Sequence, residues 1–267
     1  MALVEVNSVS KSYPRQVGLR TEQRTVVENV SLSIESGETL GLVGESGSGK
    51  TTLARMILGL VEPTAGSILV NGIDVARASR IELHRLRRQM QPVFQDPYAA
   101  LNPRMKVLEI VTEPLLIHRQ EAGIKTDRAS LREKAVELLS EVGLDEAALN
   151  RFPHEFSGGQ RQRINIARSL ALRPKLLVLD EPVSALDVSV GAQIVNLLRR
   201  LQQEYGLTYL FISHSMPLVR YLSTRIAVMQ HGRLVETGES VVLCAHPQED
   251  YTRQLIQATP ELPAGVA

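Results

Sequence analysis

A glycine-rich segment in the first fifth of the chain has the residue types and spacing that bind phosphate. It reads Gly44-Glu45-Ser46-Gly47-Ser48-Gly49-Lys50-Thr51, which fits the pattern G-x-x-x-x-G-K-[ST]. The apolar run 40–43 before it is typical of a strand, and residues 52–58 after it are typical of a helix. Glycines allow successive backbone N–H groups to point inward at a phosphate, and the helix N-terminus adds partial positive charge. The pattern predicts a loop for the phosphates of a nucleoside triphosphate.

Each residue of this loop has an expected role. Lys50 should reach the β- and γ-phosphates, and the Thr51 hydroxyl should ligate Mg²⁺. A Gly/Ser-rich turn with a neighbouring lysine is the alternative, and the flanking strand and helix argue against it. The residues expected to surround the phosphates are Gly44, Glu45, Ser46, Gly47, Ser48, Gly49, Lys50, Thr51 and Thr52.

Two carboxylates stand at the end of a second apolar run. Asp180 and Glu181 follow residues 176–179, a run typical of a buried parallel strand. Ligands bind at the carboxyl ends of such strands. We expect Asp180 to hold Mg²⁺ through water and Glu181 to orient or deprotonate an attacking water. A solvated acidic turn is the alternative, which the phosphate loop makes less favourable because Mg²⁺-dependent hydrolysis needs such a partner.

The composition limits the class of protein. The chain has 267 residues, 30 basic against 29 acidic side chains and a net charge of +1, so no bulk charge favours nucleic acid as a partner. Its one cysteine, Cys244, excludes a disulfide framework and a cysteine-based zinc site, and favours a reducing, cytoplasmic compartment. The first residues do not resemble a signal peptide, and the apolar stretch 207–219 is too short to span a bilayer.

The elements that must position these residues change character along the chain. Alternating segments near residues 3–6, 26–34 and 67–70 predict antiparallel strands, whereas 176–179 and 207–212 predict buried parallel strands. From 96 to 173 the apolar spacing is helical. We therefore expect an α/β fold in which an α-helical subdomain is inserted between two halves of a nucleotide-binding core. The expected ranges are 1–94 for the β subdomain and first core part, 95–172 for the helical subdomain, 173–243 for the second core part and 244–267 for a tail. Within them we expect Gly143 to end one helix, Ser157 to cap the next, and the tail to hold a short helix near residues 251–257 before a Pro-rich end.

Further motifs carry a resemblance. Residues 156–163, Phe-Ser-Gly-Gly-Gln-Arg-Gln-Arg, lie about two dozen residues before the acidic strand end. With the loop at Gln95, the segment 184–187 that ends in Asp187, His214 and Tyr13, they resemble the ATP-binding cassette (ABC) family in order and spacing. The resemblance covers nearly the whole chain. Phe156 replaces the usual leucine, and Ser215 replaces the usual aspartate after the histidine.

The resemblance implies a P-loop ATPase with ATP and Mg²⁺ as cofactors. It implies that Tyr13 stacks on adenine, that Gln95 helps to ligate Mg²⁺ and that His214 acts in hydrolysis with Glu181, Lys50 and Gln95. In this family two subunits sandwich two ATP molecules, so some residues act on the partner's ATP. Those residues are Ser157, Gly158, Gly159, Gln160 and Asp187.

The resemblance narrows to the dipeptide, oligopeptide and nickel importer subgroup. It rests on residues 93–104 and on the tail segment from His246-Pro247 to Tyr251–Ile256. It implies an ATPase subunit of a bacterial importer, peripheral at the cytoplasmic face of the inner membrane. Its partners would be a second cassette, identical or paralogous, two transmembrane permease subunits and, indirectly, a solute-binding protein.

Alternatives remain for the function. Peptides are the expected solute, and nickel or a metal chelate is the alternative, because nothing in this chain reads the solute. A soluble cassette ATPase acting on DNA or ribosomes usually carries two cassettes or a long coiled coil, and neither is evident here. A non-catalytic regulatory cassette should lack Lys50 or Glu181, and both are present. The sequence also leaves open the choice of homodimer or heterodimer and the role of the tail.

Overall fold

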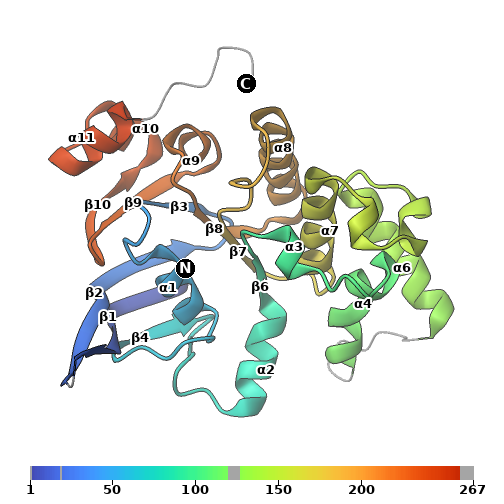
Figure 1. Cartoon of the computed structure of the whole chain (residues 1–267), viewed down its shortest axis with the longest axis horizontal. Helices are drawn as coiled ribbons and strands as arrows, with labels where there is room; N and C mark the ends of the chain where they lie inside the picture. Colours follow the sequence, from blue (N-terminus) through green and yellow to red (C-terminus); the bar gives the residue numbers. More distant parts are fainter. Residues whose placement is uncertain (1, 19, 120–126, 259–267) are drawn as a thin grey trace. The chain divides into compact units, whose positions relative to one another are not determined.

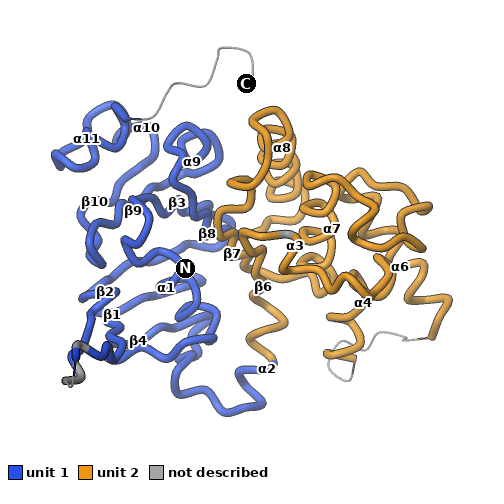
Figure 2. Tube along the Cα trace, viewed as in Figure 1, with its two compact units in different colours: residues 1–84, 208–267 blue, residues 85–207 orange. Residues whose placement is uncertain are grey.

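The computed structural model describes residues 2–18, 20–119 and 127–258. Figure 1 shows an α/β fold with strands and helices in mixed order. The chain divides into two compact units, one of residues 1–84 and 208–267 and one of residues 85–207 (Figure 2). The helix α2 (Arg80–Gln89) contains the boundary between them. The expected Pro-rich end of the chain lies outside the described residues.

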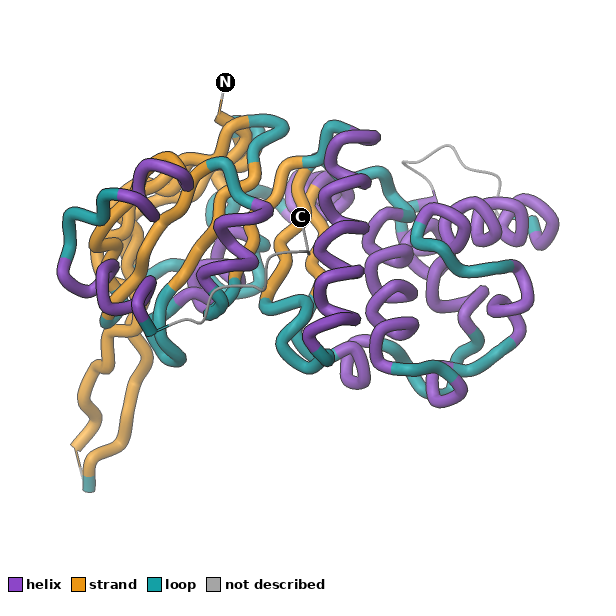
Figure 3. Tube along the Cα trace, turned by 90° about the horizontal axis from the view of Figure 1, so that it is seen from above, coloured by secondary structure: helices purple, strands orange, loops and turns teal. Residues whose placement is uncertain are grey.

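The first unit contains an antiparallel sheet with strand order β2-β1-β4-β5. Its strands are β1 (Ala2–Val17), β2 (Arg20–Glu35), β4 (Ala65–Val70) and β5 (Ile73–Asp74). The Asn71-Gly72 turn joins β4 to β5, and both residues have positive φ, as a tight hairpin requires. The antiparallel strands expected near residues 3–6, 26–34 and 67–70 are confirmed. The hairpin of β1 and β2 is longer than expected and extends well beyond the other strands of this sheet (Figure 3).

A second sheet of the first unit has β3 (Thr39–Val43) between two parallel neighbours. These are β8 (Thr208–Ile212) and β9 (Arg225–Gln230), and the antiparallel β10 (Arg233–Glu239) pairs with β9. All residues of β3 and β8 are buried, as their continuous apolar sequence predicts. The helix α9 (Met216–Leu222) packs so tightly that a Cβ at Gly41 would lie 2.3 Å from Val219 Cγ1.

The described part of the first unit also contains three further helices. They are α1 (Lys50–Ile57), α10 (Ser240–Ala245) and α11 (Asp250–Gln257). The short helix expected at residues 251–257 is thus confirmed. The helix α1 follows β3 directly through a six-residue loop, which is the strand–loop–helix arrangement that the phosphate-binding pattern requires.

The second unit is mostly helical, as expected from the spacing of its apolar residues. Its two strands, β6 (Met90–Val93) and β7 (Leu176–Asp180), pair in parallel. Its helices are α3 (Pro97–Ala100), α4 (Val107–Ile117), α6 (Arg128–Glu141), α7 (Gly158–Leu170) and α8 (Val188–Tyr205), with short 3₁₀ segments at Glu146–Asn150 and Pro153–Glu155. Gly143, with φ of 74°, terminates α6 as the sequence predicts.

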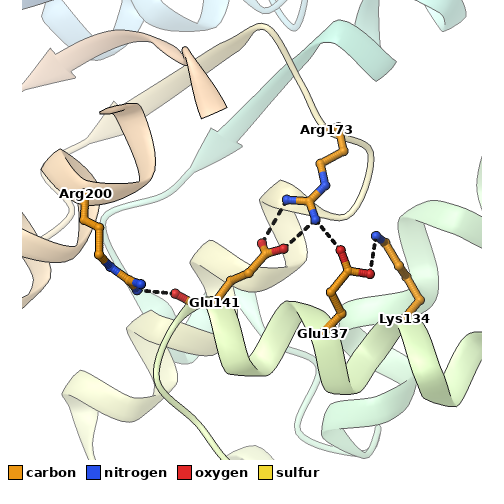
Figure 4. Close-up of polar contacts among 5 residues, drawn as sticks. All are labelled: Lys134, Glu137, Glu141, Arg173 and Arg200. Atoms are coloured by element: carbon orange, nitrogen blue, oxygen red, sulfur yellow. Dashed lines mark hydrogen bonds and ion pairs between the residues drawn. The ribbon is translucent and has the colours of Figure 1, made fainter. Parts of the chain in front are cut away.

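An ion-pair cluster joins α6 to the segment before β7 (Figure 4). Arg173 donates to Glu141 Oε2 at 3.0 Å and contacts both Glu141 Oε1 and Glu137. Its guanidinium also lies 4.7 Å from the ring centroid of Tyr205 on α8. Burial alone would lower the pKa of Arg173, but the bonds to Glu141 outweigh it and raise the pKa above its usual value. The Glu141 side chain is only 10% exposed, so this pair is less screened than a surface pair.

Removing the charge of Glu141 should therefore weaken the second unit. We expect Glu141→Gln to lower the free energy of unfolding by about 1 kcal/mol, because a neutral amide replaces a charge-assisted bidentate acceptor. Urea denaturation of the full chain measures this value. Glu133→Gln, on the exposed side of the same helix, is the matched control and should leave the midpoint unchanged. Equal midpoints for the two variants would contradict a stabilising role for the cluster.

Candidate functional site

The loop between β3 and α1 has the backbone conformation of an anion-binding loop. Gly44, Gly47 and Gly49 have φ values of 150°, 80° and 103°, which side-chain-bearing residues rarely adopt. A Cβ at Gly44 would lie 2.1 Å from the carbonyl oxygen of Met229 on β9, and one at Gly49 would lie 2.7 Å from that of Val26. The glycines are therefore required both by conformation and by the close approach of other backbone segments.

Lys50 lies inside this loop. Its Nζ donates to the carbonyl oxygens of Gly44 at 2.7 Å and Glu45 at 2.8 Å, and to Ser48 Oγ at 3.3 Å. The side chain is 5% exposed, so the ammonium is held among backbone dipoles at the first turn of α1. Thr51 and Thr52 follow on the same turn and are half-buried. The N-cap residue is Gly49. Because glycine has no side chain, the N-cap does not occupy the N–H groups at the N-terminus of α1.

Neighbouring segments fix the loop from outside. The Gly232 N–H donates to the carbonyl of Ser48 at 3.0 Å, and the Glu28 N–H donates to the carbonyl of Gly232 at 2.8 Å. The Glu45 N–H donates to the hydroxyl of Tyr251 on α11 at 3.0 Å. The sequence did not reveal this contact between Tyr251 and the loop, because 206 positions separate the two partners and no local pattern connects them.

In the second unit, Gln95 and Glu181 lie together. Gln95 Nε2 donates to Glu181 Oε2 at 3.3 Å. The strand register explains the contact, because Val93 on β6 is paired with Leu179 on β7, and each side chain comes two residues later. Parallel strands end at the same edge, so a glutamine and a glutamate far apart in sequence meet at the carboxyl end of the pair.

The backbone at Glu181 is strained. Its φ is 47°, which costs a residue with a side chain about 1–3 kcal/mol and is concentrated at functional sites. The turn is closed by Ser184, whose N–H and Oγ both donate to the Glu181 carbonyl at 3.2 and 3.1 Å. Asp180, the last residue of β7, is 9% exposed. The strand end thus presents one nearly buried and one half-buried carboxylate at a fixed, sharp turn.

Residues 156–163, which carry part of the family resemblance and are called the signature segment below, include the start of α7. Ser157 caps this helix, accepting from the Gln160 N–H at 3.4 Å, while Gln160 Oε1 accepts from the Ser157 N–H at 3.0 Å. Gly158 and Gly159 allow close packing against the turn before α8 and the first turn of α8, respectively. A Cβ on them would lie 3.1 Å from Leu186 Cδ2 and 2.4 Å from Val190 Cγ1, respectively. Ser157, Gln160 and Asp187 are all exposed. The contacts of Gly158 and Gly159 place the start of α7 beside the segment 186–190, which contains Asp187.

The remaining expected site residues lie in the first unit. Tyr13 on β1 is 38% exposed, and Lys11 Nζ lies 5.0 Å from the centroid of its ring. His214 follows β8 and is exposed, and the Ser215 N–H that follows it donates to Ser213 Oγ at 3.0 Å. The first unit thus holds Tyr13, the phosphate loop and His214. The second holds Gln95, Asp180, Glu181, the segment Ser157–Gln160 and Asp187.

These features define a class of protein. A buried parallel strand, a glycine loop around a lysine and a following helix form a P-loop nucleotide-binding fold. The family model described as ABC transporter matches residues 27–184, more than half of the chain. The chain belongs to this family, and it is an ATP-binding and ATP-hydrolysing subunit of the ABC type.

Relatives and solved structures agree with this family. The chain is 52% identical over 235 residues to the oligopeptide transport ATP-binding protein OppF of Bacillus subtilis, covering 88% of this chain and 76% of that protein. It is similar to the ATP-binding cassette MJ0796, whose dimer was solved in a post-hydrolysis state with ADP and Pi, at 32% identity and a TM-score of 0.78, covering 89% and 98% of the two chains. CbiO1 of Clostridium perfringens, part of the transporter complex cbiONQ, is 26% identical with a TM-score of 0.79, covering 92% and 91%.

The length and apolar character of the helices bear on whether any of them could cross a membrane. Within residues 2–18, 20–119 and 127–258, none combines the length and the apolar character needed to cross a bilayer.

The close packing of the loop leads to a stability prediction. Gly44→Ala should lower the free energy of unfolding by about 3 kcal/mol or more, because the new methyl group meets the Met229 carbonyl and the φ is unfavourable. Gly47→Ala is the matched control, since its Cβ meets open space and only the φ costs about 1 kcal/mol. Urea denaturation of the full chain separates the two, and equal losses would show that the approach of Met229 is not a constraint.

Proposed function

We propose that this protein powers the uptake of peptides by a bacterial importer. The observation that carries the proposal is the loop of residues 44–49, whose positive-φ glycines surround the buried ammonium of Lys50. That arrangement supports a site for nucleotide phosphates. The solute class rests on relatives named for oligopeptide transport, which are 48% and 52% identical over 97% and 88% of this chain.

ATP would be held by residues of the first unit. Residues 44–52 would surround the phosphates, with the Lys50 ammonium exchanging loop carbonyls for β- and γ-phosphate oxygens. Exposed Glu45, Ser46 and Gly47 leave this part of the loop accessible. The ring of Tyr13 would stack on adenine, and its exposed face is consistent with that role.

The residues present fit Mg²⁺ when it is brought by ATP. No group of three or more His, Cys, Asp or Glu side chains in the described ranges could hold a metal ion by itself. Mg²⁺ is usually bound by one or two carboxylates together with substrate phosphates, so this is the expected pattern. Thr51, Gln95 and Asp180 would hold it, and when bound it would neutralise charge on the phosphate oxygens.

The second unit would supply the base for hydrolysis. Glu181 would accept a proton from the attacking water, and its strained turn would keep the carboxylate at the strand end. The amide of Gln95 donates to Glu181 and would therefore lie beside the attacking water as well. His214 would assist from the end of β8.

We also propose a composite site formed with a second cassette. The exposed group of Ser157, Gln160 and Asp187 would contact ATP bound to the partner, together with Gly158 and Gly159. The dimer of the cassette MJ0796 supports a paired arrangement. The partner can be a second copy of this chain or a paralogue.

The transport role implies further partners. We propose two permease subunits, an indirect link to a solute-binding protein and a peripheral position at the cytoplasmic face of the inner membrane; CbiO1, part of a transporter complex, supports the permease contact. Residues 1–94 and 173–243 would bind nucleotide, residues 95–172 would transmit motion to the permease, and residues 244–267 would form the tail. Exposed Phe94 and Tyr98 beside Gln95 are consistent with that contact.

The variant Glu181→Gln tests whether Glu181 is the base for ATP hydrolysis. The amide keeps the shape of the side chain but cannot accept the proton of water, so we expect ATP binding to persist and hydrolysis to fall by at least about a hundredfold. Lys50→Ala should instead weaken ATP binding. Nucleotide binding and phosphate release by the assembled complex measure the two effects, and wild-type hydrolysis by Glu181→Gln would rule out this base.

The same variant serves as the control in an uptake assay. A strain lacking this gene should regain uptake of labelled oligopeptides with the wild-type chain and not with Glu181→Gln. Recovery of nickel uptake alone would support the metal-import alternative and contradict the peptide proposal.

The composite site predicts complementation between two inactive proteins. Lys50→Ala removes the phosphate loop's cation and Ser157→Arg blocks the exposed signature, so each should be inactive alone. In a mixed homodimer one site joins the intact loop of one chain to the intact signature of the other, and partial ATPase activity should return. If the partner is a paralogue, only coexpression with it should give activity. Full activity of a dilute monomer, independent of concentration, would contradict the composite site.

A further inference from the structure

The C-terminal segment of the chain reaches the phosphate loop through one side chain. Tyr251, in the first turn of α11, accepts a hydrogen bond from the Glu45 N–H, with 3.0 Å between Oη and N. Tyr251 is only 9% exposed. Burial raises the pKa of its phenol, so the hydroxyl stays protonated at neutral pH and remains a neutral acceptor for the loop.

The peptide groups on both sides of Glu45 are held in place. The Glu45 carbonyl accepts from Lys50 Nζ at 2.8 Å and from the Ser48 N–H at 3.2 Å, while Tyr251 holds the N–H of the same residue. The Gly44 carbonyl, which shares a peptide bond with that N–H, accepts from Lys50 Nζ at 2.7 Å. Tyr251 therefore fixes the orientation of the peptide whose oxygen binds the loop lysine.

Tyr251 is itself held by β10. The carboxylate of Glu236 accepts from the N–H groups of Gln248 and Glu249, at 2.9 and 3.2 Å, just before α11 begins. Burial would raise the pKa of Glu236, but these backbone bonds, together with Thr252 and the charge of Arg253, outweigh it and lower the pKa, so the carboxylate is ionised at neutral pH. Arg253 donates to the carbonyls of Pro247 and Gln248, which closes the turn. Thr252, the next residue after Tyr251, is fully buried.

We propose that Tyr251 is a positioning residue for the phosphate loop, so that the C-terminal segment 246–258 acts as a brace for the nucleotide site. The inference rests on the proposed role of residues 44–52 in binding ATP. Tyr251 does not have to touch the nucleotide. It acts through Glu45 and Lys50, because a peptide that can rotate would place the lysine less reproducibly.

Tyr251→Phe tests the brace with the least disturbance, since it removes the hydroxyl and keeps the ring that packs α11. We expect the Kd for Mg·ATP of the full chain to rise about two- to tenfold, the range for loss of one hydrogen bond. The kcat of the assembled complex at saturating ATP should stay near that of the wild type, because Glu181 is unchanged. Tyr221→Phe on α9, a half-buried tyrosine of the same unit, is the matched control and should leave the Kd unchanged.

Amide hydrogen exchange separates positioning from simple folding of the tail. In Tyr251→Phe, peptides covering residues 44–50 should exchange faster in the absence of nucleotide, while peptides covering α11 keep their protection. Loss of protection in α11 as well would show that the hydroxyl serves docking of the tail, which overturns the proposal. Equal Kd and equal loop exchange in the variant and the wild type would overturn it too.

The readouts also separate this inference from the proposed function. Failure of the wild-type chain to bind ATP would refute the nucleotide site. A wild type that binds ATP, beside a Tyr251→Phe variant that binds it equally well, would refute the brace alone.

Discussion

The hydrogen bonds from the Lys50 ammonium to the carbonyls of Gly44 and Glu45 are the interaction on which the nucleotide site depends. A cation that is 5% exposed needs fixed oxygen partners, and these partners belong to a loop whose glycines adopt positive φ. Such a loop has little regular secondary structure of its own. Contacts from β9, from Gly232 and from Tyr251 therefore maintain its shape from outside.

A second constraint acts in the helical unit. The parallel register of β6 and β7 pairs Val93 with Leu179, so the side chains two residues after this pair lie at one edge, where Gln95 meets Glu181. At Glu181 the backbone has a positive φ, and the chain turns sharply there; a hydrogen bond from Ser184 closes this turn. The two groups that the proposed reaction needs, the phosphate loop and the base, are thus each held at the end of a buried strand. The phosphate loop is built on β3, and the proposed base is built on β7.

Local patterns in the sequence predicted what depends on local structure. The phosphate loop follows from eight consecutive residues, the end of α6 from Gly143, and the cap of α7 from Ser157. The strands β9 and β10 were not predicted, and neither was the full length of the β1–β2 hairpin, in which polar residues continue the pairing past Tyr13. The bond from Glu45 to Tyr251 could not be predicted either, because it depends on how distant strands bring the tail back to the loop.

The tight contact between the start of α7 and the first turn of α8 has an evolutionary consequence. A methyl group on Gly159 would lie 2.4 Å from Val190 Cγ1, so these two positions share one small volume. A larger residue at either position requires a smaller one at the other, and glycine at 159 leaves room for the branched valine. Substitutions at positions 159 and 190 should therefore be correlated among relatives. Such a correlation in sequences alone would indicate that the two residues are in contact.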